Sequence, residues 1–417
     1  MFRTRLAKLN WLTNFSWPLF LVAILFIIPS LVIAWLSFIR QDYFQQHLEN
    51  MDLSGYLLLT LCFCCYLLGW FLLAIIKPDP NNRFLWLLVI VVFIASLVTV
   101  PLLSRDAASY ALNADIVYHS HANPYIESVS LGRQSARLGS LWWLDSPSPY
   151  GPIFLLLLGL PFLFSLGNLL LFIFSYKLLV LLAFGLTAYL FSRYRRQHNL
   201  PAYFDWLFLL NPALIINWLL EGHQEIFIVI SLLWFLNYRH KFSSQLLILL
   251  SAGLIKITAV IIWPLSWFKN KIFNWQRFFI ANLVFIFSWL LFFVLINLSP
   301  LNFWQKNLAF ANQHCFYTCS PLIIVSDAIW SSQAGLVRLV LFIATYLISL
   351  YLFLFKKHQP LKFIVWSFMA LFFINTKWLT PWYPTLIIPF SLLIKERKYL
   401  ILTGLLTAYC LWHYLGL

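Results

Sequence analysis

Residues 84–110 read FLWLLVIVVFIASLVTVPLLSRDAASY, an apolar run that ends abruptly at Ser104, Arg105 and Asp106. A helix needs about 20 apolar residues to cross a hydrocarbon core about 30 Å thick. The stretch therefore predicts a membrane-spanning helix that opens into a polar segment beyond the bilayer. Similar apolar runs recur along the chain, at residues 17–39, 53–76, 169–191, 278–298, 335–355 and 400–415.

The composition agrees with a protein whose solvent is the bilayer. Of the 417 residues, 62% are hydrophobic and 10% are charged, and the mean hydropathy is +0.84. No soluble core could hide that much apolar surface from water. We expect an all-α polytopic membrane protein with roughly 11–13 transmembrane or re-entrant helices. A single membrane domain is expected over residues 1–417, with three spans in 1–103, an outer loop at 104–151, and the other helices in 152–417.

The basic residues predict how the chain lies in the membrane. The formal net charge is +15, but the basic residues form short clusters between apolar runs, which argues against a nucleic-acid partner. Residues 17–39 are too long for the core of a cleavable signal and are read as an anchor. With Arg3, Arg5 and Lys8 placed inside, the positive-inside rule orients the chain in what we expect to be the plasma membrane, and any chemistry is expected on the opposite, extracytoplasmic face. That side receives most carboxylates, namely Asp42, Glu49, Asp52, Asp106, Asp115, Glu127, Asp145, Glu221, Glu225 and Asp327.

Two apolar segments do not fit a simple alternation of sides. Residues 152–166 are short for a span and predict an interfacial or re-entrant helix. Residues 244–268 have basic residues at both ends and predict two half-helices that meet near Lys256. A lysine at membrane depth is costly unless it is paired, either with a lipid phosphate or with a neighbouring carboxylate. Lys177 raises the same question within residues 169–191.

The cysteines fall into two groups. Cys62, Cys64 and Cys65 lie in an apolar run and are interpreted as packing residues. Cys315 and Cys319 lie on a predicted outer loop, where they either form a disulfide in an oxidising compartment or remain free.

Asp106 follows directly on the third apolar run. A carboxylate at the membrane surface can accept the proton of a sugar hydroxyl as that oxygen attacks an anomeric carbon. The alternative is an ordinary helix-terminal aspartate that caps backbone amides. The residues around Asp106 bear on this choice.

The loop that begins at Asp106 resembles that of a known family. Residues 102–125, LLSRDAASYALNADIVYHSHANPY, and residues 141–157, LWWLDSPSPYGPIFLLL, are similar to the first extracytoplasmic loop of bacterial polyprenyl-phosphate-mannose-dependent α-mannosyltransferases, which have the GT-C fold. The shared elements are an SRD-x-x-x-Y motif, an NPY, a tryptophan-containing stretch and SPYGP. In this chain they contain Asp106 and Tyr110, Tyr125, Trp142 and Trp143, and Tyr150.

Three later segments extend the resemblance. Residues 210–225, LNPALIINWLLEGHQE, resemble a family helix that ends in a Gly-x-His-Asn-Asp-like turn. Residues 254–265, LIKITAVIIWPL, resemble its lysine-bearing intramembrane element, and residues 380–384, TPWYP, also look familial. The turn departs from the pattern, because Gly222 abuts His223, and Gln224 and Glu225 replace Asn and Asp. The resemblance implies a GT-C enzyme that inverts the anomeric carbon of a lipid-phosphate-linked hexose, most simply mannose, with Asp106 as general base.

The remaining polar and aromatic candidates have more than one reading. His223 and Glu225 can bind acceptor hydroxyls, assist Asp106 or hold a divalent ion, although two ligands without fixed spacing are a weak metal signal. Lys256 is the natural partner of a lipid phosphate. Cations on the outer side can stabilise a leaving phosphate or simply be solvated, and they are Arg105, Arg133, Arg137 and Lys377. Aromatic residues that can stack on sugars or anchor the interface are Trp142, Trp143, Trp378, Trp382 and Tyr383.

The sequence thus predicts a membrane glycosyltransferase with no certain cofactor. Its partners would be a polyprenyl-phosphate sugar donor, membrane lipids, and a glycan, lipid or protein acceptor. A lipid-linked-sugar transporter or flippase would also account for Lys256 and the broken helices, but it would want matched repeats, and none is evident. A GT-C enzyme for another lipid-linked sugar and a membrane scaffold without catalysis are further alternatives.

Overall fold

The computed structural model describes residues 17–39, 53–128, 146–238, 241–269, 272–303, 305, 334–355, 359–376 and 379–415. These residues form helices and one two-stranded hairpin, in which Phe268 of β1 pairs with Phe273 of β2. The elements of the first half are α2 (Trp17–Ile39), α3 (Leu53–Ile76), α4 (Arg83–Val98), α5 (Asp106–Tyr118), α6 (Pro152–Leu157), α7 (Gly159–Ser165), α8 (Leu169–Gln197), α9 (Phe204–Leu209), α10 (Pro212–Leu214), and the π-helical η6 (Ile215–Leu220). Those of the second half are α11 (Glu225–Asn237), α12 (Phe242–Ile255), the 3-10 helix η7 (Ile257–Trp267), β1 (Phe268–Lys269), β2 (Ile272–Phe273), α13 (Trp275–Leu295), α14 (Pro300–Phe303), α17 (Ala334–Phe355), α18 (Pro360–Met369), the π-helical η9 (Ala370–Asn375), the 3-10 helix η10 (Tyr383–Leu386), α19 (Ile388–Leu392) and α20 (Arg397–His413).

Five helices in the described ranges are long and apolar enough to cross a membrane, namely α2, α3, α8, α13 and α17. Large apolar side chains on these helices face outward, as Leu61, Leu182 and Leu283 do on the bundle surface. Such a surface suits lipid and not water. The protein is therefore an all-α polytopic membrane protein.

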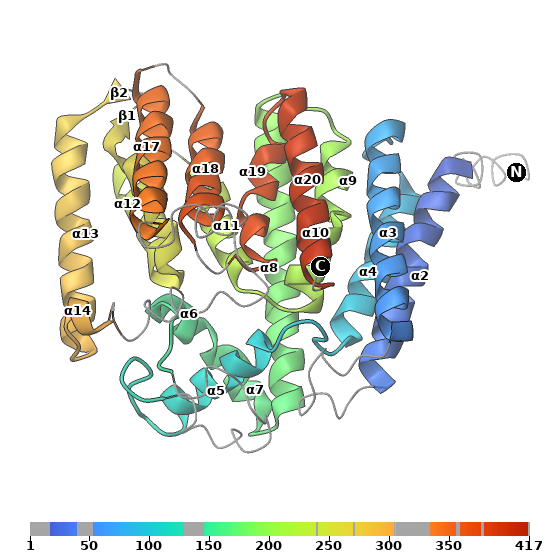
Figure 1. Ribbon diagram of the computed structural model, residues 1–417, viewed down its shortest axis with the longest axis horizontal. Helices are drawn as coiled ribbons and strands as arrows, with labels where there is room; N and C mark the ends of the chain where they lie inside the picture. The colour runs from blue at the N-terminus through green and yellow to red at the C-terminus, as the bar shows by residue number, and fades with distance from the viewer. Residues whose placement is uncertain are drawn as a thin grey trace, which may run out of the picture.

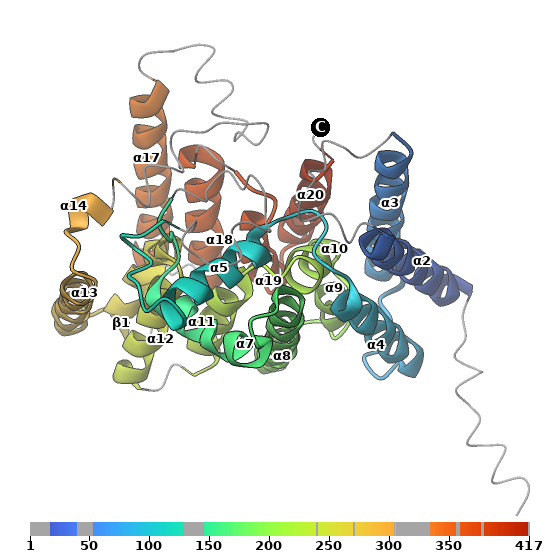
Figure 2. The same ribbon diagram turned by 90° about the horizontal axis from the view of Figure 1, so that it is seen from below.

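The helices stand in three groups with a cap at one end. Figure 1 shows α2, α3 and α4 on one side, α13, α14 and α17 on the other, and α8 with α20 between them. The short helices α5, α6 and α7 lie together beyond the ends of this bundle, next to the first residues of α8. Figure 2, viewed from that end, shows α5 lying across the bundle.

The third apolar run forms a shorter helix than the sequence predicts. We expected a helix over residues 84–103, but α4 ends at Val98. Thr99 caps it by donating its hydroxyl to the carbonyl oxygen of Ala95 at 2.6 Å. Pro101 then favours extended backbone at the residue before it, so the chain runs on without regular structure to Asp106.

Residues 152–166 form two short helices, α6 and α7, and do not form a membrane span. Neither α6 nor α7 is long enough to cross a bilayer, and both pack beside α5. Tyr118 donates its hydroxyl to the carbonyl oxygen of Leu155 at 2.9 Å. Gly159 permits this close approach, since a Cβ there would lie 2.8 Å from the Tyr118 ring.

The interruption expected near Lys256 is present. α12 ends at Ile255, Lys256 is extended with φ −153° and ψ 130°, and η7 begins at Ile257. The second segment is a 3-10 helix and not an α-helix, and it contains Pro264. α12 and η7 pack against each other, so the chain folds back on itself with Lys256 at the turning point.

Candidate active site

Asp106 is the first residue of α5. Its backbone N–H donates to the hydroxyl of Ser104 at 3.2 Å, and the N-cap residue Arg105 makes no side-chain capping bond. A carboxylate in the first turn is favoured by the helix dipole. The side chain is 15% exposed, and its Oδ2 lies 3.3 Å from Nδ1 of His223. Asp106 therefore faces an imidazole instead of capping its own helix.

Glu221 holds the segment that leads into Asp106. Its two carboxylate oxygens accept the backbone N–H groups of Leu102 at 3.1 Å and Ser104 at 2.9 Å. Glu221 itself is buried. Because it immediately precedes Gly222 and His223, one turn positions both the aspartate and its imidazole partner. The sequence placed Glu221 only among the outer carboxylates, and its proximity to His223 was the one available signal.

The turn that carries His223 has an irregular backbone. It follows the π-helical η6, a wide helical form that is common at functional sites. Gly222 has φ +76°, and a Cβ there would lie 3.0 Å from the ring of Tyr176. Only glycine suits both demands. His223, Gln224 and Glu225 then follow as fully buried polar side chains.

A chain of hydrogen bonds defines which nitrogen of His223 carries a proton. Asn217 donates its amide Nδ2 to the carbonyl oxygen of Ala213 at 2.8 Å, so its Oδ1 is free to accept. The hydroxyl of Tyr414 donates to that Oδ1 at 2.7 Å. The same hydroxyl lies 3.3 Å from Nε2 of His223. Since Tyr414 has already used its only proton, Nε2 must be the donor in this second bond.

The tautomer of His223 determines how its Nδ1 interacts with Oδ2 of Asp106. With the proton of neutral His223 on Nε2, Nδ1 has a lone pair directed toward the Asp106 carboxylate. Two acceptors 3.3 Å apart repel each other unless one proton lies on either group or a third molecule donates to both. The geometry therefore provides a place for one proton between Asp106 and His223.

Lys256 pairs with the second carboxylate of the turn. Its Nζ lies 2.6 Å from Oε1 of Glu225, and the ammonium sits over the ring of Tyr383 at 4.7 Å from the centroid. Glu225 is fully buried, and Asp106 also interacts electrostatically with Lys256. Two partners were expected for Lys256, a lipid phosphate or a neighbouring carboxylate. The structure thus shows the pair with a carboxylate, and this pair forms without a ligand.

The segment that leads into α6 packs directly on the Lys256 turning point. The backbone N–H of Gly151 donates to the carbonyl oxygen of Ile255 at 3.0 Å. A Cβ on Gly151 would lie 2.0 Å from the carbonyl oxygen of Leu254, a distance that no side chain allows. The SPYGP motif therefore has its glycine where this segment meets the junction between α12 and η7.

Tyr110 and Tyr150 of the loop form an aromatic cluster behind Asp106. Their rings are 5.1 Å apart and edge-on, and Tyr176 of α8 lies 5.3 Å from Tyr110. Burial, and then the Asp106 carboxylate, raise the pKa of both loop tyrosines well above the usual range. The hydroxyl of Tyr110 has no hydrogen-bond partner among the described residues. It is thus a neutral donor beside the carboxylates.

The TPWYP segment closes the cluster from the C-terminal half. It comes shortly after the π-helical η9. Trp382 stacks on His223 with ring centroids 4.0 Å apart, and Tyr383 lies under Lys256. These two aromatic residues contact the site, which distinguishes them from aromatic anchors that face only lipid.

Other candidates have structural surroundings. Lys177 donates to the carbonyl oxygens of Ser96 and Thr99 at the C-terminal end of α4, where a cation is favoured. Tyr125 packs against Phe292 and Phe303 and so helps fasten the loop to α13 and α14. Arg105 adjoins Asp106 at the start of α5.

Some expectations lie outside the described residues. They concern Arg133, Arg137, Trp142, Trp143, Asp145, Cys315, Cys319, Lys377 and Trp378. Within the ranges that are described, no group of three or more His, Cys, Asp or Glu side chains is arranged to hold a metal ion.

The fold and the cluster define a multi-pass membrane protein in which buried acidic, basic and aromatic side chains gather near the end of the helix bundle that carries α5. Residues 11–268 match the family model described as alpha-(1->6)-mannopyranosyltransferase, N-terminal domain. The match covers more than half of the chain, and the chain belongs to this mannosyltransferase family. It includes Asp106, His223, Glu225 and Lys256 but ends before Trp382, Tyr383 and Tyr414. No similar curated protein and no similar solved structure was found.

Proposed function

We propose that the protein transfers mannose from a polyprenyl-phosphate carrier to an acceptor outside the cytoplasm, with Asp106 as general base. The observation that carries this proposal is the contact between Asp106 and His223, which leaves a place for one proton. Family membership supports mannose as the sugar and an α-linkage in the product. Asp106, unlike Glu225, has no lysine or arginine bound directly to its carboxylate among the described residues.

In the proposed step, an acceptor hydroxyl donates to the Asp106 carboxylate beside His223. Its proton passes to Asp106 as the hydroxyl oxygen attacks the anomeric carbon of the donor. The bond from that carbon to the phosphate oxygen breaks, and its electron pair leaves with the polyprenyl phosphate. A single displacement inverts the carbon, so an α-linked product requires a β-linked donor.

The His223 imidazole would stabilise the base in the orientation needed for this transfer. Its Nδ1 lone pair and the Asp106 carboxylate both face the incoming proton, while Tyr414 fixes the opposite nitrogen. Trp382 stacks on the imidazole and restricts its rotation. The face of Trp382 opposite His223 is the proposed stacking surface for a sugar ring, since Phe372 stacks on Tyr383 and Lys256 lies over the Tyr383 ring.

Lys256 would stabilise the phosphate as negative charge grows on it. A preorganised cation in a site shielded from water is worth far more than one in solvent. Its partner Glu225 is fixed and buried, so the ammonium is held in place before the donor arrives. Arg105, Arg133 and Lys377 are further cations for this phosphate, and Glu225 with His223 would bind acceptor hydroxyls.

The donor class is tested with purified protein in liposomes. We expect radiolabelled mannose to reach an added mannoside acceptor from polyprenyl-phosphate mannose and not from a nucleotide-linked mannose. Methylation analysis of the product should show an α-linkage. Transfer from the nucleotide sugar would contradict the proposal. Movement of intact lipid-linked sugar across the bilayer without transfer would instead show a flippase.

A further inference from the structure

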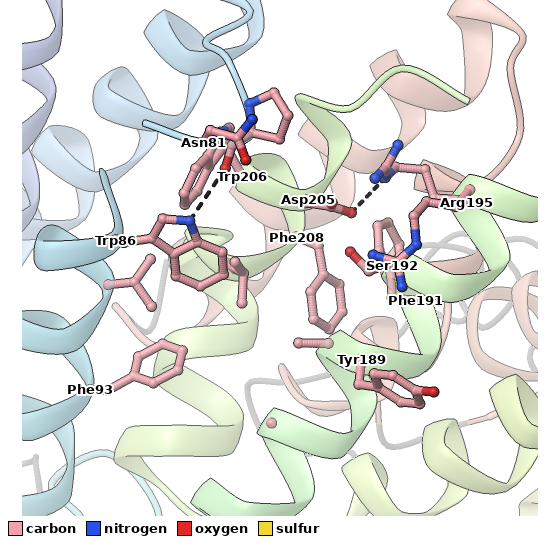
Figure 3. Close-up of a pocket in the computed structure, with 16 residues that line it drawn as sticks. Asn81, Trp86, Phe93, Tyr189, Phe191, Ser192, Arg195, Asp205, Trp206 and Phe208 are labelled. Atoms are coloured by element: carbon pink, nitrogen blue, oxygen red, sulfur yellow. Dashed lines mark hydrogen bonds and ion pairs between the residues drawn. The ribbon is translucent and has the colours of Figure 1, made fainter. Parts of the chain in front are cut away.

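A cavity of about 590 Å³ lies between α4, α8 and α9. This volume is within the range of about 300–1,000 Å³ that is typical of ligand sites. Figure 3 shows Trp86 and Phe93 along one wall, and Tyr189, Phe191 and Arg195 along the other. No residue assigned above to the candidate active site lines it.

The cavity is far from Asp106 along the bundle. Tyr176, which packs on Tyr110 behind Asp106, and Arg196, which lines the cavity, are both on α8. They are separated by 20 positions, which is about 30 Å of helix. The basic end of the cavity is therefore about one hydrocarbon thickness from the Asp106 end of α8, whereas its near end at Gly185 is about 14 Å of helix from Tyr176. A sugar donor bound at Asp106 does not reach the cavity with its reacting end.

One part of the cavity is polar and basic. Arg195 is paired with Asp205 at 2.8 Å, so those two charges balance. Arg196 is exposed and has no ion pair among the described residues, which leaves one net positive charge there. Trp86 and Tyr189 are about half exposed and add amphipathic rings of the kind found at membrane interfaces.

The remainder of the cavity is apolar. Val89, Phe191 and Phe208 are buried side chains that line it. Gly185 and Ala188 lie on the same stretch of α8, and their small size leaves room beside the helix. A Cβ built on Gly185 would have no atom within 4 Å. An apolar groove that ends at a cation is complementary to an acyl chain that ends at a phosphate.

We propose that this cavity binds an anionic phospholipid, with one acyl chain between α4 and α8 and the phosphate at Arg196. Basic pockets between membrane helices are established sites for anionic headgroups. The uncompensated charge of Arg196 favours an anionic over a zwitterionic lipid. The lipid would fill the gap between the α2–α4 group and α8 and so stabilise the bundle.

The test uses the full-length protein in detergent with added lipid. We expect dioleoyl phosphatidylglycerol to raise the thermal unfolding temperature more than dioleoyl phosphatidylcholine does. Arg196→Gln should weaken phosphatidylglycerol binding about fivefold, as measured by native mass spectrometry. Gly185→Leu should fill the groove without a clash and abolish most of the temperature rise. Lys241→Gln removes an exposed cation away from the cavity and should leave the lipid effect unchanged.

Two results would overturn this assignment. The first is an equal temperature rise with both lipids in the wild type, or an unchanged phosphatidylglycerol effect in both cavity variants. The second is a change in oligomeric state caused by Gly185→Leu, measured by light scattering, which would show that a second copy of the chain occupies the groove. None of these measurements needs sugar transfer. The lipid-binding proposal is therefore tested independently of the proposed function.

Discussion

The position of the proton on neutral His223 depends on the nearby Asn217 and on Tyr414, which lies far along the chain. Tyr414 donates to Asn217 and must therefore accept from Nε2 of His223, which leaves Nδ1 facing Asp106. This arrangement makes Tyr414 a positioning residue, since it acts on the base only through His223. It lies in the C-terminal part of the chain, beyond the 11–268 match to the family.

Tyr414→Phe should release this constraint. The Nε2 proton loses its acceptor, so we expect the histidine proton to populate both ring nitrogens and transfer to fall about 10–100-fold, as for other groups that orient a functional imidazole. The measurement is the ¹⁵N spectrum of histidine-labelled protein, with the His223 signals identified by their loss in His223→Gln.

Tyr409→Phe is the matched control, because it removes a tyrosine hydroxyl from α20, the helix that Tyr414 caps, and this hydroxyl takes no part in the hydrogen bonds to His223. It should leave the His223 signals unchanged. An unaltered ¹⁵N spectrum in Tyr414→Phe would show that Tyr414 does not fix the tautomer.

Several site residues were predictable singly, but their contacts were not. Asp106, Lys256 and the EGHQE turn stand out because polar groups beside apolar runs are costly. Their pairing is a long-range property: Leu102 and Glu221, for example, bond across 119 positions. Tyr414 has no local signal of its role, and Glu221 has only its place beside His223, since each acts through what the fold places beside it.

At the scale of elements, the junction between α12 and η7 holds Lys256 in place. Gly151 contacts this junction so closely that Gly151→Ala must displace backbone at Leu254. We expect a loss of about 1–3 kcal/mol in stability from this overpacking, and a fall in transfer because Lys256 moves. Thermal unfolding and transfer in liposomes measure the two effects.

Gly335→Ala provides the comparison for that variant. It also adds one methyl group to a glycine, but at the start of α17, where the nearest atom would lie 3.9 Å away, so both stability and transfer should stay close to wild type. Wild-type transfer by Gly151→Ala would mean that the loop does not position Lys256.

The Lys256–Glu225 pair can be separated into structural and functional contributions. Lys256→Met leaves Glu225 buried without its partner and should cost about 3–5 kcal/mol. Adding Glu225→Leu should restore most of that stability while transfer stays low, because no ammonium is left for the phosphate. Unfolding temperature and transfer rate of the single and double variants test this. Recovery of transfer in the double variant would exclude a role for Lys256 in the reaction.

At the scale of the whole molecule, one exposed cluster joins α18 to the start of α20. Glu396 contacts Lys362, and its Oε2 lies 3.0 Å from Nζ of Lys398. Hydrogen bonds from Lys362 and then Lys398 lower the pKa of Glu396 below its usual range. Its stabilising contribution is therefore present at neutral pH and is lost as the pH falls through the lowered value.

Glu396→Gln should consequently lower the unfolding temperature slightly at pH 7 and not at all in acid. The effect should stay under about 1 kcal/mol, because the carboxylate is largely exposed to solvent. Thermal unfolding of both proteins across this pH range measures it. A difference that persists below the titration of Glu396 would point to packing instead of charge.

Hydropathy sufficed for the membrane class because a span must satisfy a length and an apolar composition, and both are local properties. It failed at the end of α4, where Thr99 and Pro101 stop a helix that the apolar run alone would continue to Leu103. The apolar run at residues 244–268, with basic residues at both ends, predicted the break at Lys256. It did not predict the 3-10 form of η7. Helix type at membrane depth depends on neighbouring helices, which sequence pattern does not specify.

The central claim is that Asp106 accepts the acceptor's proton, and Asp106→Asn tests it most directly. The substitution keeps the size of the side chain and removes its basicity. In liposomes with polyprenyl-phosphate mannose, we predict that transfer falls about 10²–10⁴-fold while the unfolding temperature is unchanged. Glu127→Gln, an exposed carboxylate beyond α5, should transfer at the wild-type rate. Full transfer by Asp106→Asn would contradict the account.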